Sequence, residues 1–400
     1  MTTSTEASVP ALGEGRPPAG RWQAEIVSDR EVTFPPDWRA QVAGVQDAAL
    51  PSGSVVVSCI ASPGVAGLGR HLRELLDALD RRGQPSLCIS ASTFAGEAPP
   101  SHLLRLPGVR TALTPLGRLS PTWRMWKTRI EFDADAARRL PAGDHLIAFA
   151  GQALTQFRAA RQKRYESVAL VSAGVHVRRL ARQHAVAHRQ YPLERSHAKH
   201  IPRRCLVEYA QAERVYVSSR YTWESFTGEG FPDSRLSLFP LTPDPRFRPP
   251  LTPSSSGTFD IVYIGGLSVA KGVPLLIDAV RRLPHSDIRL VLVGGWKSRG
   301  MRRFIQQACA EDPRISAAPG DPLPHLQEAR LCVHPSYVDA FSYGAAEALA
   351  CGVPVIVSED TGMKDLIEAG RNGLVWPTGD LPALTETIEA AYRGEILQRR

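Results

Sequence analysis

The chain has 400 residues, 43% of them hydrophobic and 22% charged, and its 48 Lys and Arg residues against 40 Asp and Glu residues give a net charge of +8. Because single hydrophobic cores stop growing near about 250–300 residues, this length favours two domains of an ordinary globular protein over a disordered or fibrous chain. No apolar run approaches the roughly 18 residues of a membrane span, and the cysteines lack the Cys-x-x-Cys spacing of zinc sites, so they are expected to be reduced, buried thiols.

Residues 1–52 are expected to form an N-terminal extension that is partly disordered, with one short helix around residues 37–45. Its first twenty residues are rich in Thr, Ser, Pro and Gly. Glu6 and Glu14 stand where a secretory signal would be basic and then apolar. The expected location is therefore cytoplasmic.

Residues 53–245 alternate between strand and helix patterns, as in an α/β domain. The β-branched run Val55–Ile60 predicts a buried parallel strand, and the glycines of residues 64–69 predict a loop after it. Leucines at helical spacing predict a helix over residues 71–79. Further strands are predicted at residues 86–90, 145–149, 168–171 and 214–217.

Prolines and serines crowd residues 246–257 and the segment before them, which predicts a linker because neither a helix nor a central strand tolerates that proline density. Residues 258–400 then repeat the α/β alternation. Strands are predicted at residues 259–264, 288–293, 330–333 and 353–357, and helices at residues 274–283, 302–309, 344–350 and 381–393. The pattern predicts two Rossmann-like α/β domains that face each other across a cleft, a favoured place for a ligand.

Basic side chains crowd residues 158–204, where few acids occur. They are either solvated helix faces or a basic rim that faces an anionic acceptor or a membrane surface. Because the stretch lacks both interleaved aromatic residues and zinc-finger spacing, no nucleic acid partner is expected.

The first motif with chemical content is a buried strand that runs into Gly265-Gly266 and, shortly before a helix, Lys271-Gly272. Glycines let a ligand approach the backbone, a helix N-terminus presents free N–H groups, and a lysine adds a positive charge. Together they suit a diphosphate. The alternative is a plain strand-to-helix turn with a surface lysine, since neither the Walker nor the dinucleotide glycine pattern is present.

The second motif joins Asp339, in a loop, to Glu347, on a helix that opens at Gly344 with small residues after it. Two carboxylates so spaced can hold different hydroxyl groups of one ligand while the helix N-terminus faces its phosphates. The alternative is a helix-capping acid and a surface glutamate.

These segments resemble the retaining family 4 glycosyltransferases of GT-B fold. Residues 339–347 are similar to the E-x7-E motif of that family, with Asp in the first position, and residues 265–272 match its glycine-lysine segment. Other matches follow in order, at residues 348–356, 359–367 and 370–375. In the first half the resemblance is thinner and comprises residues 67–72, His176 and residues 208–219.

The resemblance implies a role for each matching position. Glu347 would bind the ribose hydroxyls, Asp339 would lie near the donor sugar, and Lys271 would neutralise the diphosphate. A loop at Gly67 would close over the phosphates, and His176 would reach the donor sugar or the acceptor, unless it is a histidine satisfied within its own loop. The implied catalytic residues are His176, Asp339 and Lys271, and the implied donor-binding residues are Gly67, Gly265, Gly266, Lys271, Ser342, Tyr343, Gly344, Ala345 and Glu347.

The resemblance also implies the reaction, which is the transfer of a hexosyl group from a nucleotide diphosphate sugar to an acceptor hydroxyl with retention. No metal and no cofactor other than the donor is expected. The expected partners are the nucleotide sugar and an unidentified carbohydrate, lipid-linked or small-molecule acceptor, and contact with the inner face of the membrane is left open. The alternatives are a catalytically silent nucleotide-sugar binder and an epimerase or phosphorylase of the same fold.

The sequence departs from the family in the cations expected near the diphosphate. Many relatives carry an arginine at one of the two positions held here by Gly266 and Ala270. Arg299, Arg220 or another arginine is the expected replacement. Asp339 is also one methylene shorter than the usual Glu. The chain ends soon after its last predicted helix, as in a short member or an incomplete chain.

Overall fold

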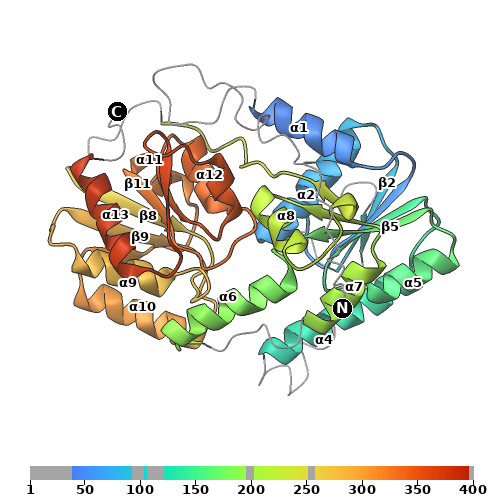
Figure 1. The fold of residues 1–400 in the computed structure, drawn as a ribbon, viewed down its shortest axis with the longest axis horizontal. Helices are drawn as coiled ribbons and strands as arrows, with labels where there is room; N and C mark the ends of the chain where they lie inside the picture. The colour runs from blue at the N-terminus through green and yellow to red at the C-terminus, as the bar shows by residue number, and fades with distance from the viewer. Residues whose placement is uncertain (1–37, 92–102, 106–120, 195–201, 251–256, 396–400) are drawn as a thin grey trace, which may run out of the picture. The chain divides into compact units, whose positions relative to one another are not determined.

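The computed structural model describes residues 38–91, 103–105, 121–194, 202–250 and 257–395. They all belong to one contact unit, Val32–Arg400. In this part of the chain two parallel sheets, one of seven and one of six strands, are each flanked by helices (Figure 1). The predicted α/β class with two Rossmann-like halves is therefore confirmed.

The first sheet has the strand order β3-β2-β1-β4-β5-β6-β7. Its central strands are buried along their whole length, as the hydrophobic runs predict for a sheet covered on both faces. The strands are β1 (Val55–Ser58), β2 (Ser86–Ser90), β3 (Leu103–Arg105), β4 (His145–Phe149), β5 (Ser167–Ser172), β6 (Arg214–Val217) and β7 (Leu236–Leu238).

The helices of this half are α1 (Trp38–Ala49), α2 (Ala66–Arg81), α4 (Pro121–Arg138), α5 (Leu154–Gln162), α6 (Val177–Gln190), α7 (Pro202–Gln211) and α8 (Arg220–Thr227). One prediction is wrong here, because two of the three glycines expected in a loop, Gly67 and Gly69, lie in the first turn of α2, and only Gly64 precedes the helix. Gly69 brings that turn against the preceding loop, since a Cβ atom on it would lie 2.0 Å from the carbonyl oxygen of Ser62. The helix therefore starts earlier than its leucine pattern.

The second sheet has the strand order β10-β9-β8-β11-β12-β13. Its strands are β8 (Phe259–Ile264), β9 (Ile288–Val293), β10 (Ile315–Ala317), β11 (Leu331–His334), β12 (Val355–Ser358) and β13 (Gly373–Trp376). Its helices are α9 (Val273–Arg282), α10 (Arg299–Glu311), α11 (Leu323–Glu328), α12 (Tyr343–Ala350) and α13 (Leu381–Arg393). The repeated strand-to-helix connection brings the carboxyl ends of the strands to one edge, where loops form ligand sites.

Part of the expected extension is ordered. Helix α1 buries Trp38 and Val42, and buried Gln46 donates a hydrogen bond to the carbonyl oxygen of Pro240 at 2.7 Å. The residues before position 38 lie outside the described part of the chain, as do residues 251–256 of the Pro/Ser linker. Residues 38–49 thus pack against the segment that leaves the first sheet.

Several cations of the basic stretch are paired with acids. Arg179 of α6 pairs with Asp360 after β12 at 2.7 Å, and Arg178 and Arg182 both pair with Glu229. In Figure 1, α6 runs from the first half beneath the second, in agreement with the bond from Tyr191 Oη, at its end, to Asp278 of α9 at 2.7 Å. This face of α6 therefore makes structural contacts, while the side chains of Arg178 and Arg182 remain 55% and 62% exposed.

Candidate functional site

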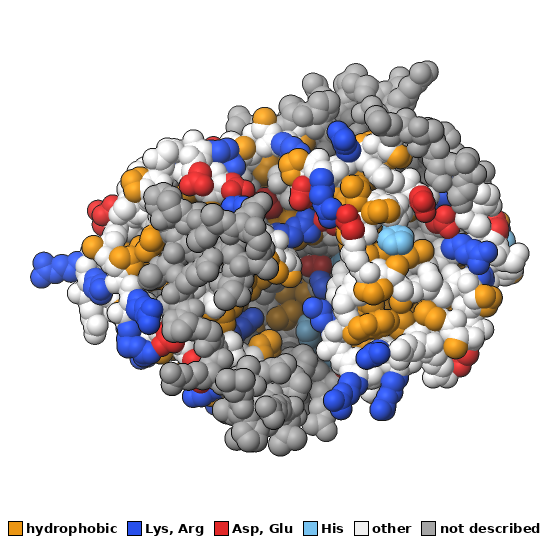
Figure 2. All heavy atoms as spheres, turned by 180° about the vertical axis from the view of Figure 1, so that it is seen from behind, with side chains coloured by type: hydrophobic (Ala, Val, Ile, Leu, Met, Phe, Trp, Pro, Cys, Tyr) orange, Lys and Arg blue, Asp and Glu red, His pale blue; other side chains and the backbone are white. Residues whose placement is uncertain are grey.

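A cavity of about 600 Å³ lies where the carboxyl ends of strands from both sheets meet. Figure 2 shows the hollow from behind, with basic and acidic side chains inside it. The lining comes from the first turn of α2, the loops after β4 and β5, the loops after β8 and β9, and the start of α12. The predicted residues that line it are Gly67, Gly265, Gly266, Lys271, Asp339, Ser342, Tyr343, Gly344 and Glu347.

The turn after β8 has the geometry that its glycines predict. Gly265 has a φ of +147° and Gly272 a φ of +69°, both in the region that glycine favours. A Cβ atom on Gly272 would lie 1.9 Å from the carbonyl oxygen of Pro335, so the loop also needs glycine for close packing. Lys271 lies between Gly265 and Gly272 in this turn, and its side chain is 30% exposed.

Lys271 and Asp339 form an ion pair, in which Lys271 Nζ lies 2.5 Å from Asp339 Oδ2. The same carboxylate oxygen lies 3.0 Å from His334 Nε2, and Ser336 Oγ lies 2.9 Å from that nitrogen. Burial alone would raise the pKa of Asp339, but Lys271 and His334 hold it well below its ordinary value. Asp339 is therefore ionised, and it keeps the lysine pointed into the cavity.

Helix α12 begins under backbone strain. Ser342 precedes it with a φ of +71°, unusual for a residue with a side chain. The N–H of Ala346 makes the first bond inside the helix, to Ser342, so the N–H groups before it are available to a ligand. Ala345 does not line the cavity, and its side chain is buried against the core.

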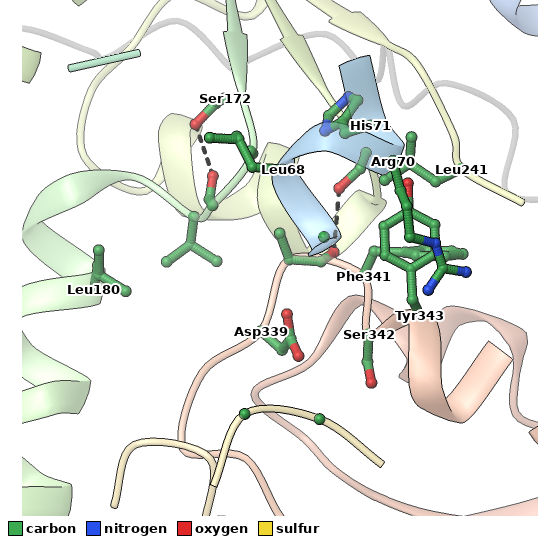
Figure 3. Close-up of a pocket in the computed structure, with 18 of the residues that line it drawn as sticks. Leu68, Arg70, His71, Ser172, Leu180, Leu241, Asp339, Phe341, Ser342 and Tyr343 are labelled. Carbon is green, nitrogen blue, oxygen red and sulfur yellow. Dashed lines mark hydrogen bonds between the residues drawn. The ribbon is translucent and has the colours of Figure 1, made fainter. Parts of the chain in front are cut away.

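Glu347 lies one turn into α12, is 2% exposed, and forms an ion pair with Arg70 of α2. Figure 3 shows Arg70 beside the ring of Tyr343, and its guanidinium carbon lies 4.0 Å from the ring centroid. Burial raises the pKa of Glu347, and Arg70 opposes that shift. The carboxylate expected to bind ribose is thus held by an arginine from the other half of the molecule.

A second contact joins the same two helices. Tyr343 Oη donates a hydrogen bond to Glu74 Oε1 of α2 at 2.8 Å. Glu74 Oε2 accepts from the backbone N–H of Thr242 at 2.8 Å and from its hydroxyl at 3.0 Å. Burial raises the pKa of Glu74 to about 7, although these hydrogen bonds act in the opposite direction. Helix α2, helix α12 and the segment after β7 therefore meet at one carboxyl group.

The structure does not bring His176 into the cavity. His176 caps α6 and is 4% exposed, and its ring packs 5.1 Å from the ring of Tyr209 and 5.0 Å from that of Phe226. Burial lowers its pKa to about 4. Its geometry is that of a histidine satisfied within its own loop, and its neighbours Val175 and Val177 line the cavity instead.

The candidates for a second diphosphate cation are also placed elsewhere. Arg299 begins α10 and Arg220 begins α8, and neither lines the cavity. The basic residues that do line it, besides Lys271, are Arg70, Arg129 and Lys297. None of these three was predicted as a site residue, because each lies outside the two motifs. Only the fold brings them to the same edge.

The described residues contain no group of three or more His, Cys, Asp and Glu side chains that could hold a metal ion. The Asp-Ala-Asp triplet that begins at Asp133 lies within α4, where Asp133 accepts the backbone N–H groups of Thr155 and Gln156 at 2.7 and 3.0 Å. This aspartate therefore caps α5.

No helix in the described ranges is both long and apolar enough to cross a membrane.

The second half of the chain is similar in sequence to known proteins. Residues 258–393 match the sequence model of the glycosyl transferases group 1. A D-inositol 3-phosphate glycosyltransferase from Pseudarthrobacter chlorophenolicus is 30% identical over 147 residues, which are 34% of this chain and 35% of that protein. The match thus spans about a third of the length of this relative.

Solved structures resemble the chain over most of its length. Sucrose-phosphate synthase from Thermosynechococcus elongatus has a TM-score of 0.65 at 20% identity, over 85% of this chain and 90% of that one. The Anabaena protein HepE in complex with UDP-glucose has a TM-score of 0.58 at 18% identity, over 85% and 90% of the two chains. These likenesses confirm the predicted GT-B fold. The match to the glycosyl transferases group 1 model is confined to residues 258–393.

Proposed function

We propose that this protein transfers a hexosyl group from a nucleotide diphosphate sugar to an acceptor hydroxyl, with retention of the anomeric configuration. One observation carries the proposal. Lys271 lines the same cavity as Glu347 and the start of α12, although the lysine and the helix come from separate segments of the chain. A cation, a buried carboxylate and free backbone N–H groups are the groups that a diphosphate and a ribose require.

Each group has a part in donor binding. Glu347 accepts hydrogen bonds from the ribose hydroxyls once Arg70 has been released. The N–H groups before Ala346 and the positive end of α12 face the diphosphate, which Lys271 also contacts. Asp339 lies beside Lys271 and accepts from a hydroxyl of the sugar.

Transfer then breaks the bond between the anomeric carbon and the diphosphate oxygen. A bond from the acceptor oxygen forms on the same face of the sugar, and the departing diphosphate takes the acceptor proton. The main task of the protein is to stabilise the charge of the leaving diphosphate with preorganised cations and backbone dipoles. This division of work needs no carboxylate nucleophile.

The acceptor enters from the first half, where the loops after β4 and β5 line the cavity with Gln152, Ser172 and Val175. We propose a carbohydrate, a lipid-linked sugar or a small hydroxyl compound as the acceptor, in the cytoplasm or at the inner face of the membrane. The related structure solved with UDP-glucose supports a nucleotide sugar as the donor.

The test is release of nucleoside diphosphate from UDP-, GDP-, ADP- and dTDP-sugars with a crude acceptor extract. We expect one donor class to be used, with release lost in Lys271→Ala and Glu347→Ala. The matched controls are Lys127→Ala, a half-buried lysine of α4 that does not line the cavity, and Glu386→Ala, an exposed glutamate of α13. Both should retain activity.

Binding separates this proposal from its rival, a silent nucleotide-sugar binder. If a nucleotide raises the melting temperature but no donor releases product, transfer is refuted and a silent binder is favoured. If no nucleotide binds, the placement of the donor site is itself wrong.

A further inference from the structure

The loop after β9 carries a second lysine to the wall of the cavity where the diphosphate is placed. The N–H of Leu267 donates to the carbonyl oxygen of Gly295 at 3.0 Å, and the N–H of Lys297 donates to that of Leu267 at 3.2 Å. These bonds continue the parallel pairing of β8 and β9 beyond the sheet. The backbone of Lys297 is therefore fixed against the glycine turn.

Gly266 makes room for the side chain of Lys297. A Cβ atom on Gly266 would lie 2.4 Å from Lys297 Cε and 3.4 Å from Nζ. The stem of the lysine thus crosses the bare backbone of that glycine, and its ammonium group lies over the turn that precedes Lys271. Both lysines line the cavity.

The charges around Lys297 differ from those around Lys271 and Arg70, the two cations next to the start of α12 and the loop before it. Lys271 is neutralised by Asp339 at 2.5 Å, and Arg70 is neutralised by Glu347. Lys297 is exposed and has no acidic partner among the residues that the structure describes. It therefore supplies the excess positive charge that a bound diphosphate needs.

We propose, on the basis of the proposed function, that Lys297 is a second cation for the donor diphosphate, and that it selects diphosphates over monophosphates. The absence of a side chain at position 266 lets a lysine from the neighbouring strand end occupy the position above the turn. Lys297 thus takes the place of the arginine that many relatives carry at the position of Gly266 or Ala270.

The experiment compares the dissociation constants of nucleoside diphosphates and the matching monophosphates by calorimetry, using UDP, GDP, ADP and dTDP with UMP, GMP, AMP and dTMP. For the base that the wild type binds, Lys297→Ala should reduce the preference for diphosphate about tenfold, the value of one charge-assisted hydrogen bond. Its affinity for monophosphate should stay within about twofold, and Lys297→Arg should retain the preference.

The matched control is Arg299→Ala, which removes an equal charge two residues away and outside the cavity. It should leave both affinities unchanged. If Lys297→Ala keeps the preference for diphosphate, this inference alone is overturned. It is also overturned if the variant loses affinity for diphosphate and monophosphate equally, since that indicates a structural role. A wild type that binds neither ligand class refutes the proposed function instead.

Discussion

Asp339 holds two neighbours at once, since its carboxylate pairs with Lys271 at 2.5 Å and lies 3.0 Å from His334. While that pair persists, the lysine charge is shared between the carboxylate and any phosphate in the cavity. The ligand therefore competes with a residue of the protein for the same ammonium group.

Neutralising this carboxylate should strengthen the binding of a diphosphate. In Asp339→Asn, Lys271 no longer has an anionic partner, so we expect about two- to fivefold tighter binding of the nucleoside diphosphate, within the value of a partly exposed ion pair. Transfer should fall, because the sugar loses its carboxylate. Calorimetry and a release assay measure the two effects. Asp380→Asn, at the exposed cap of α13, is the control, and unchanged or weaker binding in Asp339→Asn would contradict the argument.

The cysteines give a second prediction at this scale. Five of the six thiols are buried and Cys309 is half-buried. Burial raises the pKa of Cys59 and of Cys205 to about 12, so these groups are neither accessible nor ionised near neutral pH. A thiol reagent should label one cysteine per native chain and all six after denaturation. Cys309→Ser should abolish the native labelling, and a second fast thiol would contradict the burial.

Residues within a linear motif were predictable, whereas residues assembled by the fold were not. Lys271, Asp339 and Glu347 lie in segments whose spacing indicated a diphosphate and a ligand with hydroxyl groups, and all three line the cavity. Arg70 lies in the matched segment 67–72 but its pairing with Glu347 depends on how α2 is packed, and Lys297 carries no local signal, because its position depends on how the loop after β9 is packed. For His176 the resemblance gave a site residue, but the aromatic contacts of its ring point to a structural one.

At the scale of elements, the contact between α12 and β8 positions the candidate site. Gly344, in the first turn of α12, packs on the end of β8, where a Cβ atom would lie 2.5 Å from the carbonyl oxygen of Ile264. The sequence predicted this helix to within one residue, since small side chains allow close approach. It missed the early start of α2, because glycines are usually an indication of a loop.

Adding one methyl group at this contact should move α12. Gly344→Ala is expected to destabilise the protein by about 2 kcal/mol, because the new atom meets the backbone of β8 and not a flexible side chain. Gly44→Ala in α1 is the matched control, since nothing lies within 4 Å of its added Cβ and alanine favours a helix by about 0.5–1 kcal/mol. Urea unfolding measures both changes. If Gly344→Ala has the same unfolding free energy as the wild type, α12 is not tightly packed against β8.

At the scale of the whole molecule, Glu74 connects parts of the chain that are far apart in sequence. Its carboxyl group bonds to Tyr343 and Thr242, and Gln46 Nε2 lies 3.4 Å from it. Because its pKa is raised to about 7 from 4.5, the folded state binds its proton more tightly than the unfolded state. Its contribution to stability is therefore fully present below about pH 4.5 and is lost as the pH rises through about 7.

Glu74→Gln should remove that dependence. The difference in unfolding free energy between this variant and the wild type should change by up to about 3 kcal/mol from pH 4.5 to 7 and be constant above about pH 8, with the variant relatively more stable at high pH. Denaturant unfolding across this range measures the difference. Glu386→Gln, an exposed change, should give a flat difference. If the unfolding free energies of Glu74→Gln and the wild type change with pH in parallel, this carboxyl group titrates normally.

The bond between Arg70 and Glu347 has a consequence for the time course of binding. In the proposed donor site the ribose takes the carboxylate oxygen that the arginine now holds, so we expect the arginine to leave first, at a rate that the nucleotide concentration does not change. Rapid-mixing experiments should therefore show observed association rates that level off as the nucleotide concentration rises, at the rate at which the pair opens. In Arg70→Met the rates should increase linearly over the same range, because Glu347 then has no arginine partner that must dissociate first.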